Sequence, residues 1–366
     1  MKKLNVGVIG SGAISDIYLQ NMIHRFPSLD VQAVASAHPE NARKKAGQYG
    51  LRTMTVEEML QDPQIEMVVI LTPVGTHYQL IRRSLEHGKH VYTEKTMTDA
   101  PEKARELIRI ADERNLYLGS APDTFLGAAL QTARKAVDDG LLGDIHSFAI
   151  SSTRCNDLLL SMFSFLREPG CGIAYDYAVY YLTALVSLLG PVDQVASMIS
   201  APYPEHTGII PERPDYGKTF ATPNESQIDA IIRMKSGVTG TLHLDADSLT
   251  GDEAFFSIYG RKGVLRLTDP NQFGGEVLFI PVQWDRFGTS GGRVLEPVSE
   301  LSDNCRGIGP EEMAEAIIEG RPNRASKEMA YHVLETLTAI LESGKEGAFQ
   351  KVGSTCERPQ PFQYQA

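Results

Sequence analysis

The sequence predicts an α/β fold: a doubly wound parallel sheet in the N-terminal part, followed by an α+β part with a large, mostly antiparallel open sheet. Three observations predict it. Up to about residue 120, short and nearly unbroken apolar runs alternate with helical stretches, which is typical of a parallel sheet covered on both faces. A glycine-rich turn follows the first of these runs. Beyond residue 120 the strand-like segments become longer and follow one another, which favours antiparallel pairing.

Five apolar runs in the first part are expected to form its buried strands, at residues 4–9, 31–35, 67–71, 90–92 and 116–118. Helical stretches separate them, at residues 14–24, 39–49, 56–61, 77–87 and 100–114. Strands and helices that alternate in this way build a parallel sheet through crossover connections.

The second part begins where this rhythm changes, and we expect the domain boundary at residue 122. Its expected helices lie at residues 127–139, 172–189, 310–320 and 326–343. Its strand-like segments lie at residues 145–151, 193–200, 226–235, 238–245, 253–259 and 263–268. Two stretches rich in proline, glycine and charge are expected to be loops, at residues 201–225 and 281–305.

Composition excludes several classes of partner. The 366 residues include 35 Lys and Arg against 46 Asp and Glu, a net charge of −11, so a nucleic acid or an anionic membrane would be repelled. The four cysteines are scattered without a CxxC pair, so neither a metal site nor a disulfide framework is expected. The N-terminus has no signal-peptide core and no apolar stretch near 18 residues, from which we expect a cytoplasmic protein.

A glycine turn follows the first strand, in the segment Gly10-Ser11-Gly12-Ala13-Ile14. Gly10 allows a tight turn, and Gly12 lets the backbone approach a pyrophosphate. Ala13 and Ile14 then begin the helix whose N-terminus attracts the phosphates. Because this turn belongs to the first strand–helix unit, it predicts a bound dinucleotide.

The residue at the end of the second strand distinguishes a ribose with a free 2′-hydroxyl, as in NAD, from one with a 2′-phosphate, as in NADP. An enzyme that binds NAD commonly has an acidic residue there, which accepts from the ribose 2′-hydroxyl. This chain has Ser36, so no charge would repel a 2′-phosphate, and His38 or the later Arg43 and Lys44 could approach one. Arg43 and Lys44 fit a solvated helix face equally well. NAD and NADP both remain open.

Two further strand ends carry polar residues. Thr72 and Pro73 follow the third apolar run, and His77 begins the next helix, where it either meets the nicotinamide end or caps a turn. Glu94 and Lys95 follow the fourth run. Since open parallel sheets bind ligands at the carboxyl ends of their strands, all five residues are expected at the cofactor site.

In the second part, Asp176 and Tyr180 are four residues apart, so a helix would present both on one face. A tyrosine can exchange a proton with a substrate hydroxyl, and a neighbouring ammonium would lower its pKa. Tyr175, Tyr177 and Tyr181 lie close by in the sequence, and aromatic clusters on helices often serve packing. Both interpretations of Tyr180 remain open.

These motifs together resemble the glucose–fructose oxidoreductase / inositol dehydrogenase / MocA (Gfo/Idh/MocA) family, over nearly the whole chain. The resemblance is carried by four stretches: GxGxx at residues 10–14, TPxxxH at 72–77, GKHVxxEK at 88–95 and GxGxxxD at 170–176. Two positions depart from the family: Thr96 replaces the proline of Glu-Lys-Pro, and Tyr180 stands where most members have histidine.

The resemblance implies roles for three residues. Lys95 would hydrogen-bond the reacting oxygen, and independently of any family a cation there would stabilise the oxygen of a developing carbonyl. Tyr180 would exchange the hydroxyl proton, and Asp176 would orient the substrate by accepting from one of its hydroxyls.

Asp123 and Phe125 fall where family members often have an Asn-x-Arg pattern. A carboxylate and an aromatic ring suit a polyhydroxylated substrate, so both residues are expected to contact it. The alternative is an ordinary turn fixed by Pro122.

The resemblance implies a Rossmann domain over residues 1–122 and a substrate-binding and oligomerisation domain over residues 123–366. It implies an NAD(P)-dependent oxidoreductase that transfers a hydride between a nicotinamide and a secondary hydroxyl, or a ketone, of a sugar, glycoside or cyclitol. Oxidation of a glycoside at C3 is one form of this activity. A redox-dependent glycosidase and a non-catalytic sugar or nucleotide sensor are the alternatives. The cofactor, NAD or NADP, is released at each turnover or stays tightly bound. The expected partners are a small carbohydrate and further copies of the chain, as a dimer or tetramer.

Overall fold

The computed structural model describes residues 2–248, 254–283, 288–289 and 291–364, which form two compact units. The first contains Met1–Leu126 and Asp303–Leu334, and the second contains Gly127–Ser302 and Glu335–Ala366. The boundary expected at residue 122 would assign residues 303–334 to the second domain. In the structure these residues belong to the first unit.

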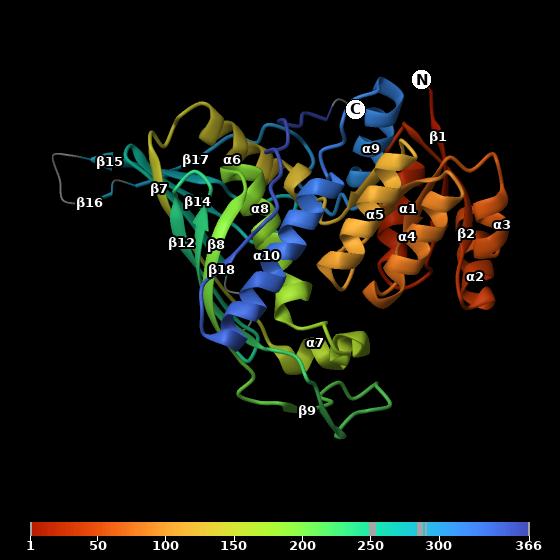
Figure 1. Cartoon of the computed structure of the whole chain (residues 1–366), viewed down its shortest axis with the longest axis horizontal. Helices are drawn as coiled ribbons and strands as arrows, with labels where there is room; N and C mark the ends of the chain where they lie inside the picture. The colour runs from red at the N-terminus through yellow and green to blue at the C-terminus, as the bar shows by residue number, and fades with distance from the viewer. Residues whose placement is uncertain (1, 249–253, 284–287, 290, 365–366) are drawn as a thin grey trace. The chain divides into compact units, whose positions relative to one another are not determined.

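The first unit is built on a parallel sheet in the order β3-β2-β1-β4-β5-β6. Figure 1 labels its strands β1 and β2 beside the helices α1 to α5. Its strands are β1 (Leu4–Ile9), β2 (Leu29–Ala35), β3 (Arg52–Thr53), β4 (Met67–Ile70), β5 (His90–Thr93) and β6 (Leu118–Ser120). The order runs outward from β1 in both directions, so right-handed crossovers place the connecting helices on both faces. The predicted doubly wound parallel sheet is therefore confirmed.

The helices of this unit are α1 (Ser15–His24), α2 (Pro39–Tyr49), α3 (Val56–Gln61), α4 (His77–Glu86), α5 (Pro101–Glu113), α9 (Ile308–Glu319) and the first turns of α10 (Lys327–Glu346). Helix α4 packs on α5, and α9 packs on α1. The strands β1 and β4 are almost wholly buried, which explains their unbroken apolar sequence. Strand β3 was not expected, because its two exposed residues carry no apolar run.

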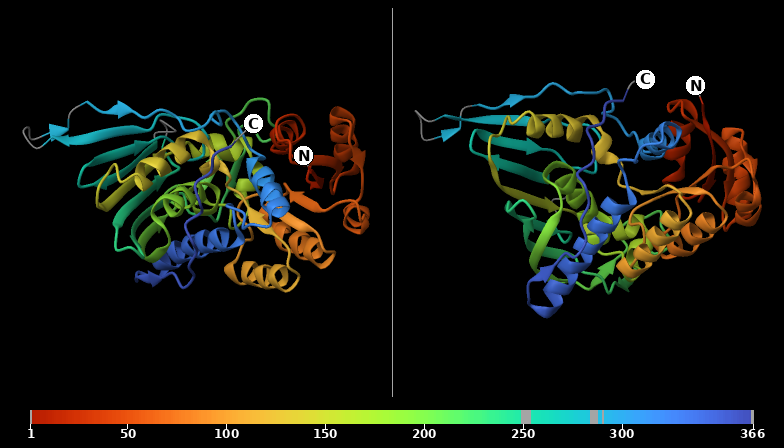
Figure 2. Two further views of the ribbon diagram at one scale, coloured as in Figure 1. Left: turned by 90° about the horizontal axis from the view of Figure 1, so that it is seen from above. Right: turned by 45° about the horizontal axis from the view of Figure 1, so that its top comes forward.

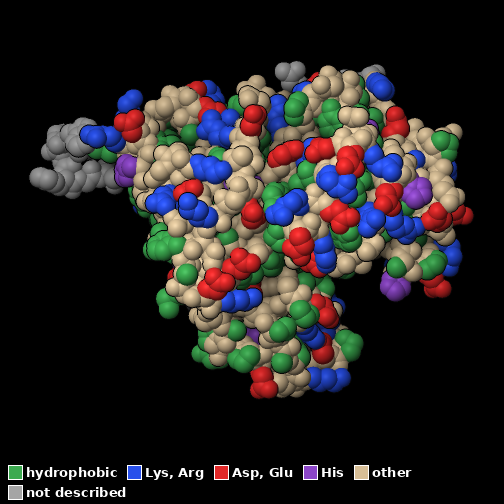
Figure 3. All heavy atoms as spheres, viewed as in Figure 1, with side chains coloured by type: hydrophobic (Ala, Val, Ile, Leu, Met, Phe, Trp, Pro, Cys, Tyr) green, Lys and Arg blue, Asp and Glu red, His purple; other side chains and the backbone are tan. Residues whose placement is uncertain are grey.

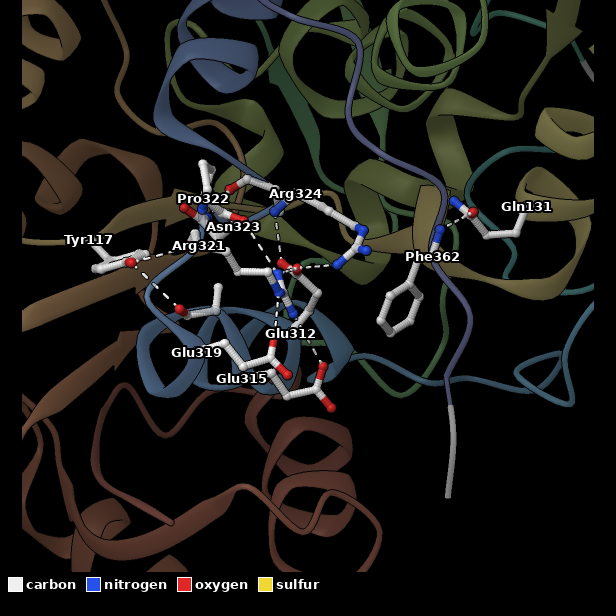
Figure 4. A network of polar contacts seen from close by, with 12 residues as sticks. Tyr117, Gln131, Glu312, Glu315, Glu319, Arg321, Pro322, Asn323, Arg324 and Phe362 are labelled. Atoms are coloured by element: carbon white, nitrogen blue, oxygen red, sulfur yellow. Dashed lines mark hydrogen bonds and ion pairs between the residues drawn. The ribbon is translucent and has the colours of Figure 1, made fainter. Parts of the chain in front are cut away.

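A buried carboxylate fixes the chain after α9. Glu312 is fully buried, and its side chain accepts from Arg321 and Arg324 at 2.5 and 2.7 Å (Figure 4). The backbone N–H of Arg324 donates to the same carboxylate at 2.8 Å. A buried charge is tolerated only when it is paired in this way. The network therefore holds the turn between α9 and α10 in place within the first unit.

The second unit contains a ten-stranded sheet among the described residues, in the order β16-β15-β14-β13-β7-β12-β11-β8-β18, with β17 beside β15. Its central strands are β7 (Ile145–Thr153), β8 (Val192–Ser200), β11 (Gln227–Met234), β12 (Thr239–Asp245), β13 (Ala254–Gly260) and β14 (Gly263–Leu267). Its outer strands are β15 (Leu278–Gln283), β16 (Gly288–Thr289), β17 (Arg293–Val294) and β18 (Gln350–Lys351). Only β7 and β12 pair in parallel among these described strands, so the expected mostly antiparallel sheet is confirmed.

Helices α6 (Ala128–Asp138) and α8 (Val179–Leu189) pack on one another and against one face of this sheet (Figure 2). Helix α8 is buried from Val179 to Leu188, which makes it the centre of the core. Along β11 the residues alternate between buried and exposed, so the opposite face of the sheet carries exposed side chains.

Several regions of the second unit differ from the sequence expectation, among them residues 281–305, expected as a loop, which contain β16, β17 and the end of β15. The stretch at residues 201–225 is not a plain loop, because it contains the hairpin of β9 (Glu205–Thr207) and β10 (Thr219–Ala221). A short helix, α7 (Asn156–Met162), and a 3₁₀ turn at Ser164–Arg167 precede it and were not predicted. These pieces are too short for a periodic pattern to reveal them.

On the face seen in Figure 3, Lys and Arg side chains are interspersed with Asp and Glu, so the acidic excess is not gathered into one patch there. No helix among the described residues is both long enough and apolar enough to cross a bilayer.

Candidate functional site

The glycine turn of the first unit leaves room for a phosphate. Gly10 has φ +122°, and a Cβ there would lie 2.6 Å from the carbonyl oxygen of Leu71, so only glycine fits. A Cβ on Gly12 would meet nothing within 4 Å. Both Gly12 and Ala13 are exposed beside the start of α1, where Ile14 supplies no side-chain cap. The N–H groups of this helix start are therefore placed to bind phosphate oxygens, and the residues present fit a pyrophosphate.

The end of β2 presents a hydroxyl rather than a carboxylate. The Ser11 hydroxyl donates to the Ser36 hydroxyl oxygen at 2.8 Å, and the N–H of His38 donates to the same oxygen at 3.2 Å. Ser36 therefore lies directly beside the glycine turn. The side chains of His38, Arg43 and Lys44 are exposed nearby in the sequence. This arrangement accommodates a ribose with or without a 2′-phosphate.

His77 connects two loops of the same edge. Its ring is fully buried, with Nδ1 2.8 Å from the Thr96 carbonyl oxygen and Nε2 2.7 Å from the Thr72 carbonyl oxygen. Burial lowers the pKa of this imidazole, and the two carbonyl contacts oppose that effect. Because both nitrogens face carbonyls, His77 positions the loops after β4 and β5. Thr72 is half-buried and Pro73 is exposed at that edge.

Glu94 holds Lys95 at the end of β5. One carboxylate oxygen of Glu94 accepts from the Tyr18 hydroxyl at 2.6 Å, and the other accepts from the backbone N–H of Lys95 at 3.1 Å. Tyr18 is buried in α1, and this burial raises its pKa well above the ordinary value, as does the nearby Glu94. Glu94 thus ties Lys95 to the helix that starts at the glycine turn. Lys95 itself is half-buried, and a cis peptide bond joins it to Thr96.

Asp123 and Phe125 are placed otherwise than expected, since each is only 1% exposed. One Asp123 oxygen accepts from the N–H groups of Gly307 and Gly309, both at 3.1 Å, at the start of α9. Burial raises the pKa of Asp123 to about 6. A carboxylate at a helix N-terminus is favourable. These surroundings give Asp123 a structural role and do not support the expected substrate contact of either residue.

In the second unit, Asp176 lies in a π-helical turn, Ala174–Ala178, that runs into α8. A regular α-helix was expected here, with Asp176 and Tyr180 on one face. The expected helix is present, but its first turn is π-helical rather than α-helical, and Asp176 and Tyr180 still lie about one turn apart along it. Asp176 is half-buried and Tyr180 is 9% exposed, and the rings of Tyr177 and Tyr180 are 6.4 Å apart. Such single π turns are frequent at functional sites.

Asp176 lines a small cleft of about 20 Å³ in this unit, which has both polar and apolar lining residues. Arg154 lies 3.4 Å from its carboxylate, and the Arg154 guanidinium is 4.1 Å from the centre of the Tyr177 ring. Glu225 accepts from the N–H of Ala174 at 3.0 Å, and burial raises the pKa of this carboxyl while the N–H opposes it. Asn156 also lines the cleft. Charged and amide groups of this kind can bind several hydroxyls at once.

Sequence reasoning missed Arg154, Asn156 and Glu225. One signal could have found the first two, because Arg154 follows β7 directly and Asn156 lies two residues further on, at the start of α7. No short motif marks Glu225. Its contact in the cleft is with the N–H of Ala174, which lies 51 residues away in the sequence. Among the described residues, no group of three or more His, Cys, Asp or Glu side chains is placed to hold a metal ion.

Comparisons with known proteins agree with these features. The pattern of the Gfo/Idh/MocA oxidoreductase family with an NAD-binding Rossmann fold matches residues 4–121, and that of a Gfo/Idh/MocA C-terminal domain matches residues 130–266. The scyllo-inositol 2-dehydrogenase (NADP(+)) of Bacillus subtilis is 22% identical over 352 residues, 94% of each chain. Some curated relatives are matched over about half their length, such as an uncharacterized oxidoreductase of Schizosaccharomyces pombe, 26% identical over 56% of that protein.

Solved structures show the same fold. Levoglucosan dehydrogenase in complex with NADH and levoglucosan superimposes with a TM-score of 0.80 at 21% identity, covering 96% of this chain and 99% of that one. A curated levoglucosan dehydrogenase of Pseudarthrobacter phenanthrenivorans is 24% identical over 79% of each chain. At this identity the superposition shows the fold alone.

Proposed function

Since the chain belongs to the Gfo/Idh/MocA family of NAD(P)-dependent oxidoreductases, we propose that it transfers a hydride between a nicotinamide cofactor and a secondary hydroxyl, or a ketone, of a sugar, glycoside or cyclitol. One observation carries the proposal: helix α1, which starts at the open glycine turn, carries Tyr18, whose hydroxyl donates to the Glu94 carboxylate that also accepts from the backbone N–H of Lys95. The substrates named for relatives, inositols and levoglucosan, support the substrate class.

The cofactor would be held by the backbone of the glycine turn, from Gly10 to Ile14, and its ribose by Ser36 and His38. When bound, the nicotinamide accepts or donates the hydride. The ammonium of Lys95 polarises the substrate oxygen and stabilises the charge that develops on it. Tyr180 exchanges the hydroxyl proton.

The cleft in the second unit supplies orientation. Asp176 accepts from a substrate hydroxyl, and Arg154 donates to another substrate oxygen. Arg154 lies 3.4 Å from the Asp176 carboxylate, so the two side chains can bind neighbouring hydroxyls of one substrate. Fixing the substrate in this way aligns one carbon for hydride transfer.

Lys95→Met tests the proposal. Turnover with the best sugar or cyclitol of a panel, measured as NADH or NADPH absorbance, should fall at least ~10²-fold because the charge on the oxygen is no longer stabilised. Dinucleotide affinity should change little, since the turn is intact. Lys103→Met is the matched control, because Lys103 pairs with Asp99 at 2.8 Å on the surface of the same unit. Full turnover in Lys95→Met would refute the role of Lys95.

The same panel separates the two alternatives. A redox-dependent glycosidase would release the aglycone without accumulation of reduced nucleotide. A sensor would bind the dinucleotide and a sugar with no absorbance change. Denaturing the purified protein and identifying any released nucleotide decides between NAD and NADP and shows whether the cofactor stays bound.

We also infer a homo-oligomer formed through the uncovered face of the large sheet. Met198 on β8 and Ile231 on β11 are 77% and 56% exposed on neighbouring strands of that face. An exposed apolar patch on a sheet is a common site of association. Ile231→Lys should shift the molar mass measured by light scattering towards that of the single chain, and an unchanged mass would contradict this assignment.

A further inference from the structure

A second cleft, of about 330 Å³, lies in the same unit as the Asp176 cleft. It is bordered by the start of α7, the strand β9 and the residues that follow β12. Its lining includes Asn156, Asp157, Tyr203, His206 and Asp247. Its volume is within the range of ligand sites in proteins. The functions assigned so far make no use of it.

His206, which lines this cleft, has a buried nitrogen without a hydrogen-bond partner among the described residues. Its side chain is 3% exposed, and Nδ1 lies 2.7 Å from a carboxylate oxygen of Asp157. Nε2 is buried and has no hydrogen-bond partner among the described residues. Buried polar atoms are nearly always paired, so an orphan of this kind indicates a missing ligand. In the neutral ring, the proton on Nδ1 faces Asp157, which leaves Nε2 as an acceptor for a hydroxyl.

The imidazole is also held rigidly. Its ring stacks on Phe220 of β10, with the ring centres 6.0 Å apart. The guanidinium of Arg167 covers that Phe220 ring at 3.7 Å. The position of Nε2 is therefore fixed before any ligand binds, which lowers the entropic cost of binding.

The chemistry of the lining selects the class of ligand. Asp157 and Asp247 place carboxylates beside the imidazole, and Asp247 already accepts from the Ser226 hydroxyl at 2.6 Å. Such acceptors repel an anion and favour a neutral molecule with many hydroxyl donors. Tyr203 is 65% exposed at the same cleft and offers an aromatic face to the C–H side of a sugar ring.

The two clefts are neighbours along the chain. Arg154 lines the Asp176 cleft, Cys155 lines the His206 cleft, and Asn156 lines both. A ligand that extends beyond Asp176 past Asn156 would enter the second cleft. We propose that the His206 cleft binds a second sugar ring, so that the preferred substrate is a disaccharide or a glycoside with a polyhydroxylated aglycone. This inference rests on the proposed oxidoreductase function for the ring that is oxidised.

The test compares kcat/KM of the full chain for cellobiose, maltose and trehalose with that for glucose. At least one disaccharide should be preferred to glucose. His206→Ala should lower kcat/KM for that disaccharide about tenfold, the effect of one lost hydrogen bond, and leave glucose unchanged. His243→Ala is the matched control, because His243 makes the same 2.7 Å contact with Asp229 but is 44% exposed and lines neither cleft.

Other outcomes decide the question as well. A panel in which glucose is as good as every disaccharide, or equal losses for both substrates in His206→Ala, would overturn the proposal. Tyr203→Ala should show the same selective loss and, since Tyr203 is mostly exposed, it keeps the test valid if His206→Ala fails to fold. If no sugar is oxidised, the proposed function fails. Calorimetry then tests the His206 cleft independently of catalysis. Disaccharide binding to the native chain but not to His206→Ala supports the proposed sugar site, and no binding to the native chain overturns it.

Discussion

Ser36→Asp provides a sensitive test of the cofactor site. The Ser36 hydroxyl lies 2.8 Å from that of Ser11 in the glycine turn, so an aspartate there would place its carboxylate beside the bound ribose. In NAD the 2′-hydroxyl would donate to this carboxylate, whereas in NADP the 2′-phosphate would be repelled by it. With Ser36 in place, the native chain should bind NADP without this repulsion.

The size of the effect follows from Coulomb's law. Two unit charges about 4 Å apart interact by ~1 kcal/mol in water, and a phosphate monoester carries between one and two charges, so the repulsion is ~2 kcal/mol. That free energy corresponds to an NADP affinity lower by about 30-fold. A hydrogen bond from the ribose hydroxyl to the new carboxylate should strengthen NAD binding by about tenfold.

Calorimetric titration with NAD and NADP at one fixed ionic strength measures both effects, since salt screens the repulsion. Ser36→Asn is the matched control, because it has nearly the size of aspartate without its charge. The reasoning is refuted if the Asp and Asn variants weaken NADP binding equally, or if the Asp variant keeps NADP affinity within about twofold of the native value.

Three further predictions concern the second unit and the buried carboxylates. Tyr180→Phe should lower turnover by ~10²-fold or more at unchanged cofactor affinity, and unchanged turnover would exclude proton exchange by Tyr180. Arg154→Met should raise KM by about tenfold or more and affect kcat less, because a charged hydrogen bond that orients the substrate is lost; steady-state kinetics showing a loss in kcat alone would contradict this role. Burial raises the pKa of Glu311 from 4.5 to about 7, so the folded state binds more protons between these values and the free energy of unfolding falls as the pH rises through that window. Glu311→Gln should remove up to ~3 kcal/mol of this decrease in the free energy of unfolding. Urea denaturation at pH values on either side of the window measures it. An unchanged pH dependence of stability in the variant would show that Glu311 does not cause the decrease.

Local pattern was enough for much of the first unit. The buried strands that carry the site are unbroken apolar runs, and Gly10 is required by a turn whose φ only glycine adopts readily. Lys95 was predicted at a strand end because parallel strands bring their carboxyl ends to one edge. Each of these inferences depends on residues close together in the sequence.

Contacts between distant residues account for what the sequence did not reveal. Asp123 was expected to meet a substrate, but the start of α9, 184 and 186 residues later, covers its carboxylate. The pairing of His206 with Asp157 spans 49 residues and depends on a hairpin with too few residues to show a pattern. The two ring contacts of His77 likewise join loops that no motif connects.

By itself the sequence determined which apolar runs form buried strands, where the glycine turn lies and which side chains can carry charge. These features depend on hydrophobic periodicity and backbone freedom, which are local properties. Only the tertiary structure decided which of those charged side chains are enclosed and which face a cleft. Burial depends on segments that meet after folding: Asp123 is enclosed against the start of α9, and Nε2 of His206 is enclosed without a hydrogen-bond partner among the described residues.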